Sequence, residues 1–134
     1  MWEITVSSKK RNEMIDITSE IQSLLDDHAI TNAQLCIYVP HTTAAITINE
    51  GADPSVQYDI INTLEKLIPY HSNYRHGEGN SDAHIKASLL GPSVSVIVKN
   101  GRIILGTWQH IFFYEGDGPR TRKVYVDAQI SQTK

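Results

Sequence analysis

The chain has 134 residues, 40% of them hydrophobic, and its 12 basic and 15 acidic side chains give a formal net charge of −3. We expect residues 1–134 to form a single domain, because a chain of this length buries a sufficient core, and the single Cys36 excludes an internal disulfide and indicates the reducing cytoplasm. The sequence contains neither an apolar run long enough for a membrane span nor a signal-like start, which argues against membrane partners. It also lacks an excess of basic residues, which argues against nucleic-acid partners.

Alternation of apolar and polar residues predicts two strands at the start of the chain, over residues 2–7 and 15–17. We expect these two strands to pair as a hairpin. Ser19 and Gln22 have the spacing of a capping box, and the apolar residues that follow recur with the period of a helix. The pattern therefore predicts a first helix over residues 20–29.

The middle of the chain predicts two more strands, over residues 33–39 and 44–49, and a second helix. Asp53 followed by Pro54 is typical of a helix start, with the aspartate as the N-cap. Pro69 ends the helical pattern. One face of this helix carries an apolar stripe made of Val56, Ile60, Leu64 and Leu67.

The last third of the chain predicts a short helix and then several strands. Ser81 is a candidate N-cap, and Gly91-Pro92 ends that helix. Asn100-Gly101 is a strong hairpin signal. The strands are expected over residues 94–98, 102–105, 107–114 and 121–129. Tight turns between strands favour an α+β fold, with a mainly antiparallel sheet or partial barrel and two or three packed helices.

Six histidines are many for a chain of this size, and several stand near the expected ends of elements. His41 follows a strand that Pro40 ends, His76 ends a polar loop, and His84 lies in the first turns of the next helix. Three imidazoles of this kind could hold a zinc-like ion with an open position for water or substrate. Their spacing is not diagnostic, however, so ordinary surface or core histidines remain the alternative.

Oxygen-bearing side chains gather where a predicted strand gives way to a helix. Asn49, Glu50 and Asp53 fall within five residues and could hold a magnesium-like ion or supply a general base. The alternative is that Asp53 is only a helix cap, although a cap also fixes a carboxylate in orientation, which a partner of a metal-bound histidine requires.

Arg120 and Arg122 stand two apart on a predicted strand, so their guanidinium groups leave the same face. Together they could hold a phosphate or a diphosphate. The alternative is a pair of solvated arginines that Glu115 or Asp117 neutralises.

Several blocks, taken together and in this order, resemble the YjbQ-like family over nearly the whole chain. The blocks are His41-Thr42-Thr43-Ala44, Asn49-Glu50 with Asp53, Tyr74-Arg75-His76, His84-Ile85-Lys86-Ala87-Ser88 with Gly91, Gly106-Thr107-Trp108-Gln109, and Asp117-Gly118-Pro119-Arg120. The resemblance implies a homotrimeric α+β protein. It also implies that His41, His76 and His84 converge on a metal or catalytic site beside Asn49, Glu50 and Asp53.

The family is associated with a secondary thiamine-phosphate synthase activity. The resemblance thus implies a transferase that joins a thiazole phosphate to a pyrimidine methyl diphosphate and releases pyrophosphate. Catalytic roles would fall to Glu50 and Asp53, and a divalent metal on the histidines would be zinc first, with magnesium as another possibility. The expected substrate-binding residues are Asn49, Lys86, Trp108, Gln109, Arg120 and Arg122.

Two other functions stay open at this point. One is a metal-dependent hydrolase of a phosphorylated small molecule. The other is a trimer without catalytic activity that binds a metabolite or a metal. Turnover would favour an enzyme, whereas thermal stabilisation by a ligand without turnover would favour a binding protein.

Overall fold

The computed structural model describes residues 1–131, and within them the chain forms two antiparallel sheets and three helices. The helices are α1 (Thr18–Asp27), α2 (Pro54–Leu67) and α3 (Ser81–Leu90). The strands are β1 (Trp2–Ser7), β2 (Glu13–Asp16), β3 (Ala33–Tyr38), β4 (Ala44–Glu50), β5 (Ser93–Lys99), β6 (Arg102–Ile103), β7 (Gln109–Glu115) and β8 (Thr121–Ile130).

The larger sheet has five strands in the order β1-β8-β3-β5-β6, and the smaller has three in the order β2-β7-β4. All pairings are antiparallel, which confirms the expected α+β class. Alternate residues of β3, Ala33, Leu35 and Ile37, are buried, and they share a core with Ile46 of β4 and Phe113 of β7. The main core therefore lies between the two sheets.

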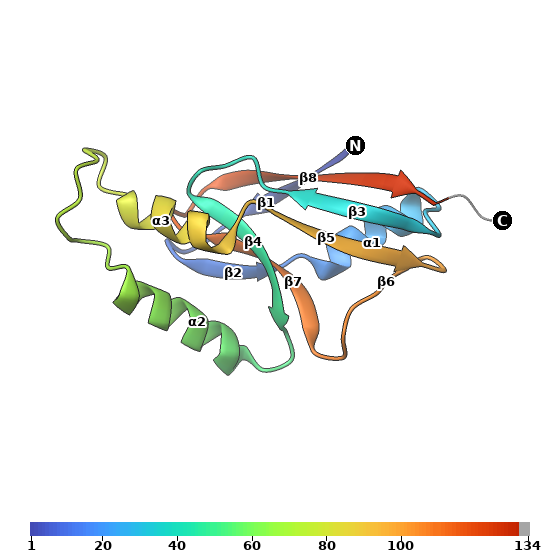
Figure 1. Ribbon diagram of the computed structural model, residues 1–134, viewed down its shortest axis with the longest axis horizontal. Coiled ribbons are helices and arrows are strands. Elements are labelled where there is room, and N and C mark those ends of the chain that lie inside the picture. The colour runs from blue at the N-terminus through green and yellow to red at the C-terminus, as the bar shows by residue number, and fades with distance from the viewer. Residues whose placement is uncertain (132–134) are drawn as a thin grey trace.

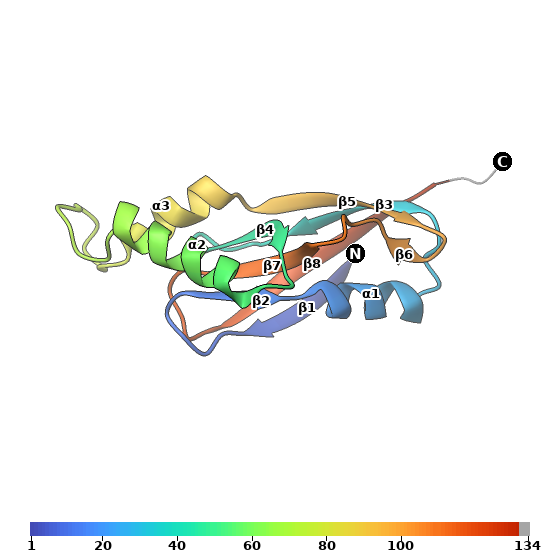
Figure 2. The ribbon, with the colours of Figure 1, turned by 90° about the horizontal axis from the view of Figure 1, so that it is seen from below.

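The helices lie at opposite ends of the molecule. Figure 1 and Figure 2 show α2 and α3 together at one end, beyond which the segment 70–80 extends, and α1 at the other end. Ile21 and Leu25 of α1 are fully buried in the main core. No helix among residues 1–131 has both the length and the apolar character that crossing a membrane requires.

The predicted hairpin between residues 2–7 and 15–17 is wrong. β1 pairs with β8, with Trp2 opposite Val126, whereas β2 pairs with β7, with Met14 opposite Tyr114. The two strands thus belong to different sheets. The reason is that Val6 packs in the main core, whereas Met14 packs in a second cluster beneath α2. Two strands paired in one hairpin could not place these two side chains in separate clusters.

The structure confirms one of the three predicted helix starts and changes the other two. The capping box is not formed, because α1 begins at Thr18, whose backbone N–H donates to Asp16 Oδ1 over 3.0 Å. The start of α2 is confirmed, since the Asp53 carboxylate accepts from the backbone N–H of Ser55 at 2.9 Å. Ser81 is the first residue of α3 and not its cap, a place that Asn80 takes.

The hairpin at Asn100-Gly101 is confirmed. Both residues have positive φ, 52° and 78°, which is the backbone of a tight turn between β5 and β6. β6 is shorter than the predicted strand 102–105, and β7 begins at Gln109 instead of residue 107.

Candidate functional site

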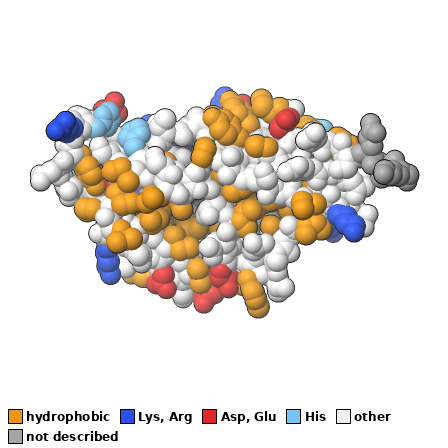
Figure 3. Space-filling view, in the orientation of Figure 1, with side chains coloured by type: hydrophobic (Ala, Val, Ile, Leu, Met, Phe, Trp, Pro, Cys, Tyr) orange, Lys and Arg blue, Asp and Glu red, His pale blue; other side chains and the backbone are white. Residues whose placement is uncertain are grey.

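The three predicted histidines and the two predicted arginines line one open pocket of about 460 Å³. Loops bring them there: the turn from β3 to β4, the segment 70–80, the first turns of α3 and the start of β8. In Figure 3, histidine side chains gather at the end of the molecule that this segment occupies. The full lining, called the histidine–arginine pocket below, is Pro40, His41, Thr42, Thr43, His76, Glu78, Asn80, His84, Arg120 and Arg122.

His41 is fixed by the backbone of β8. The backbone N–H of Lys123 donates to Nε2 of His41 over 3.0 Å, so a neutral ring carries its proton on Nδ1. Burial, and then the positive charge of Arg122, hold the pKa of His41 below its usual value. At neutral pH this ring is therefore uncharged, and its lone pair is already in use.

His76 and His84 lie against each other edge to face, with ring centroids 5.4 Å apart. His76 Nε2 stands 4.0 Å from a carboxylate oxygen of Glu78. Between Met1 and Ser131, no group of three or more histidine, cysteine, aspartate or glutamate side chains is arranged to hold a metal ion. A neutral His41 has one ring lone pair, which already accepts from Lys123, so coordination through either ring nitrogen would break that bond. This arrangement therefore does not fit a three-histidine metal centre.

Arg122 is buried and forms a pair with Glu115. Arg122 Nε donates to Glu115 Oε1 at 2.9 Å, and Nη2 donates to the other carboxylate oxygen and to Thr43 Oγ1. Ser8 Oγ also donates to Glu115. Burial alone raises the pKa of Glu115, but these donors and the charge of Arg122 outweigh it, so the pKa is lowered. The pair fixes the guanidinium in the wall of the pocket.

Arg120 is more exposed and pairs with Asp117. Its Nε donates to the carbonyl oxygen of Asp117 at 2.8 Å and its Nη2 donates to the carboxylate at 2.9 Å. Both arginines thus have the acidic partners that the sequence offered as an alternative to phosphate binding. They nevertheless line the same pocket.

Asn80 is a pocket residue that the sequence did not single out. Its Nδ2 donates to Asp117 Oδ2 at 2.9 Å, whereas its Oδ1 is buried without any hydrogen-bond partner among the described residues. The residue is only 8% exposed, and a buried acceptor of this kind is costly unless a donor reaches it. Sequence reasoning gave the helix cap to the neighbouring Ser81, and no pattern in the sequence marked Asn80.

Lys86 does not line the pocket. It is fully buried on α3, where its Nζ lies 3.2 Å from Asp82 Oδ2, one turn earlier on the same helix. Arg11 donates two further hydrogen bonds to Asp82, at 2.9 and 3.0 Å. In this structure the lysine that was expected to bind the substrate instead belongs to a charged network with Asp82 and Arg11.

The other predicted site residues lie at the far end of β4, across its pairing with β7. Asn49 is opposite His110 and Glu50 opposite Gln109 in the sheet. β4 has seven residues and is thus about 20 Å long, so this second group does not meet the histidines within one chain. Figure 3 shows acidic side chains gathered at this edge. The members, called the β4-end group below, are Asn49, Glu50, Asp53, Trp108 and Gln109.

Much of the β4-end group is engaged in local hydrogen bonds. Glu50 Oε2 accepts from the backbone N–H groups of Ala52 and Asp53, at 2.6 and 3.0 Å, and Gln109 Oε1 accepts from that of Gly106 at 2.8 Å. Trp108 stands out in this group because the residue is 62% exposed. An exposed tryptophan is suited to contact a ligand or another protein.

The lowered pKa of His41 makes stability depend on pH. Protonation removes the acceptor for Lys123 N–H and adds a charge beside Arg122, so it favours the unfolded chain. The free energy of unfolding of the parent should therefore fall as pH drops below about 6.5, the ordinary pKa of histidine. His41→Gln offers a neutral acceptor and should lack this part of the decrease. Urea unfolding at pH 7 and pH 5 measures the effect.

The control for that measurement is His71→Gln, at an exposed histidine outside the pocket, which should follow the parent. An equal decrease between pH 7 and pH 5 in the parent and in His41→Gln would contradict the assignment.

Comparisons with other proteins agree on one family. A family model described as UPF0047 protein YjbQ-like matches residues 2–131. UPF0047 protein MJ1081 of Methanocaldococcus jannaschii is 54% identical over 126 residues, 94% of this chain and 91% of that protein. UPF0047 protein YugU of Bacillus subtilis is 52% identical over 124 residues, 92% of this chain and 94% of that protein.

Solved structures share the fold. A YjbQ/UPF0047 family protein of Clostridium acetobutylicum superposes with a TM-score of 0.93 at 46% identity, covering 96% of this chain and all of that one. The protein APE1520 of Aeropyrum pernix gives 0.92 at 35% identity, covering 97% and 98%. The resemblance seen in the motifs is thus confirmed at the level of the family. The chain belongs to the YjbQ-like UPF0047 family.

Proposed function

We propose that the histidine–arginine pocket binds a phosphate or diphosphate ester and that the protein is an enzyme acting on this small molecule in the cytoplasm. The observation that carries the proposal is the meeting of Arg120, Arg122 and three histidines around one open pocket, in a chain whose net charge is −3. Guanidinium groups match phosphate oxygens, and histidine is the side chain best suited to transfer protons near neutral pH.

For the reaction itself we propose the transferase chemistry that the family resemblance implies, in which thiazole phosphate displaces pyrophosphate from a pyrimidine methyl diphosphate. A leaving pyrophosphate gains negative charge, which fixed cations next to it stabilise. Arg122 is suited to this task because Glu115 and Thr43 hold it in place before a ligand arrives. His84 and His76 are exposed enough to exchange protons with the ligand.

A hydrolase of phosphorylated small molecules is the second candidate, and the open mouth of the pocket, which admits water, favours it. Assays with both transferase substrates and with single phosphate esters separate the two enzymes. Ligand binding without turnover of any of them would indicate a binding protein instead.

Replacing Arg120 with lysine should weaken pyrophosphate binding about tenfold. Arg120 uses two of its donors on Asp117 while its guanidinium borders the pocket, and a single ammonium group cannot do both. Loss of one charge-assisted hydrogen bond is worth roughly 1.5 kcal/mol or more, which corresponds to this factor. Isothermal titration calorimetry with pyrophosphate measures the change.

Arg102→Lys serves as the matched control, because Arg102 is exposed on β6 and does not line the pocket. That variant should bind pyrophosphate like the parent. Equal affinity in the parent and in Arg120→Lys would remove Arg120 from the site, and no binding by the parent would overturn the proposed function.

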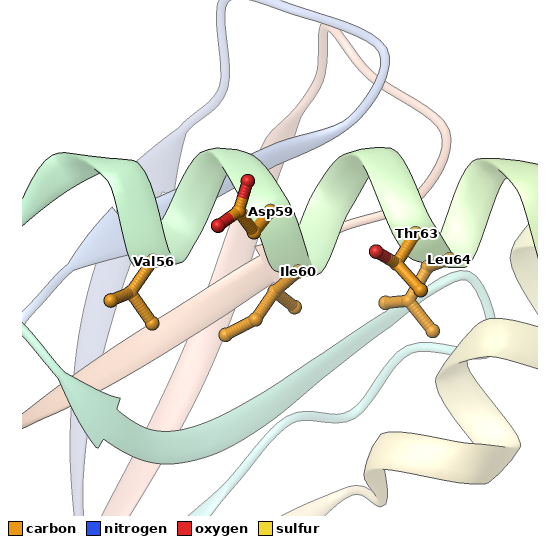
Figure 4. A pocket seen from close by; sticks show the side chains of 5 residues that line it. All are labelled: Val56, Asp59, Ile60, Thr63 and Leu64. Atoms are coloured by element: carbon orange, nitrogen blue, oxygen red, sulfur yellow. The ribbon is translucent and has the colours of Figure 1, made fainter.

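We also propose that the chain forms a homotrimer, as the family resemblance implies. α2 supports this proposal, because none of its residues is fully buried and one of its faces is apolar. Figure 4 shows Val56, Ile60 and Leu64 pointing from α2 into a shared open pocket of about 420 Å³. A second copy of the chain that covered this face would remove apolar surface from water.

A cyclic trimer also offers a role for the β4-end group. In a ring, each copy presents one surface to one neighbour and a different surface to the other. Two groups at opposite ends of one chain can then meet across an interface. We propose that Glu50 and Trp108 of one copy approach the histidine–arginine pocket of the next, where acidic and basic groups would complement each other.

A further inference from the structure

A second pocket of about 340 Å³ adjoins the histidine–arginine pocket and shares only two residues with it, His76 and His84. The two rings that meet edge to face, 5.4 Å apart, therefore form the common wall. The members of this second pocket, called the tyrosine–isoleucine pocket below, are Tyr74, Arg75, His76, Ser81, His84 and Ile85.

The two pockets differ in chemistry. The histidine–arginine pocket is lined by guanidinium groups, hydroxyls and imidazoles and, among the described residues, has no aliphatic or phenol side chain beyond Pro40. The tyrosine–isoleucine pocket also has a guanidinium, Arg75, and a hydroxyl, Ser81, but it adds an aromatic ring and a branched aliphatic side chain. The Tyr74 hydroxyl donates to the carbonyl oxygen of Pro69 at 2.6 Å, which fixes the ring in place. An aromatic face and an aliphatic side chain suit a flat ring, as a charged wall suits a phosphoryl group.

The position of α3 explains why both pockets open beside the same histidine. His84 and Ile85 are consecutive residues on a helix, so their side chains leave about 100° apart. His84 can then border both spaces while Ile85 faces only the second. Ile85 is 41% exposed, so its side chain is open to a ligand in this pocket.

We propose that one ligand occupies both pockets: a phosphate ester of a planar, largely apolar ring, with the phosphoryl group against Arg120 and Arg122 and the ring against Tyr74 and Ile85. The link between the two parts of the ligand then lies beside His76 and His84. This inference rests on the proposed function, since it assigns the phosphoryl group to the histidine–arginine pocket. It adds the second pocket as the place of the organic part, and Tyr74 and Ile85 as the residues that select it.

Two esters of equal charge test the inference, because phenyl phosphate carries a ring and methyl phosphate does not. Calorimetry should show that phenyl phosphate binds the parent at least tenfold more tightly. Ile85→Asn makes the second pocket polar and Ile85→Trp fills it, and both variants should bind phenyl phosphate about as weakly as methyl phosphate. Neither should change the affinity for methyl phosphate by more than about twofold.

Leu89→Asn is the matched control, one turn along α3 at an exposed leucine that lines neither pocket, and it should behave like the parent. Equal affinity of the parent for the two esters, or an equal loss of both in the Ile85 variants, would overturn the inference while leaving the phosphate site in place. Failure of the parent to bind either ester while it binds pyrophosphate would overturn this inference alone. Failure to bind all three would overturn the proposed function, and this inference with it.

Discussion

Asp82→Asn should lower the free energy of unfolding by about 3–5 kcal/mol, the usual loss when one partner of a buried ion pair is removed. Asp82 and Lys86 are both fully buried, and the carboxylate accepts from Lys86 and twice from Arg11. The asparagine has nearly the same size but no charge, so Lys86 would remain buried without a counter-ion. Urea unfolding at pH 7, followed by circular dichroism, measures the loss.

A matched control is Asp127→Asn, at a carboxylate whose side chain is 70% exposed and lies 3.6 Å from the N-terminal amine. This change should stay within about 0.5 kcal/mol of the parent. Adding Lys86→Met to Asp82→Asn removes the stranded charge and should restore part of the stability. A loss below about 1 kcal/mol for Asp82→Asn would contradict the description of this charged network.

The same network of Asp82, Lys86 and Arg11 makes the free energy of unfolding depend on pH in the acidic range. Burial alone would raise the pKa of Asp82, but the hydrogen bonds and charges of Arg11 and Lys86 outweigh it, so the pKa lies below its ordinary value. A carboxylate of this kind stabilises the fold above its unfolded pKa of about 4, and the contribution disappears as pH falls through the lower folded value. The difference between the parent and Asp82→Asn should therefore shrink below pH 4.

The second large effect is expected in the mass of the assembly that the chain forms in solution. The parent should sediment at about 45 kDa, three times the 15.0 kDa of one chain, and Val56→Glu should sediment at about 15 kDa. Val56 lies on the apolar face of α2 and is not part of the clusters that pack beneath the helix, so a charge there should weaken assembly without unfolding the chain (Figure 4). Sedimentation equilibrium at micromolar concentration distinguishes the masses.

Ser55→Glu adds the same charge one position earlier, outside the apolar pocket, and should leave the trimer intact. The exposed Trp108 provides a further readout in a Trp2→Phe background, which leaves one tryptophan in the chain. If Trp108 approaches the pocket of a neighbour, pyrophosphate should change its fluorescence in the trimer and not in the Val56→Glu monomer. A parent that sediments at 15 kDa would contradict both the assembly and the composite site.

The local elements of this protein follow from neighbours in the sequence. Period-two alternation identified the strands, because it depends only on which side of a pleat each residue faces. Asn100-Gly101 and Asp53-Pro54 located a turn and a helix start, because the required backbone angles and the capping bond are local properties. The family motifs, with their order along the chain, identified the family and drew attention to His41, His76 and His84.

The tertiary structure decided which distant segments meet and which charged side chains are buried. Nothing local distinguishes β1 pairing with β2 from β1 pairing with β8, since alternation specifies a face and not a partner. Lys86 was expected to bind the substrate, and only Arg11, 75 positions earlier, and the surrounding core make it a buried partner of Asp82. Charge, solvation and pairing of a side chain depend on contacts that lie far apart in the sequence, so the site could be suggested from its residues but was arranged only by the fold.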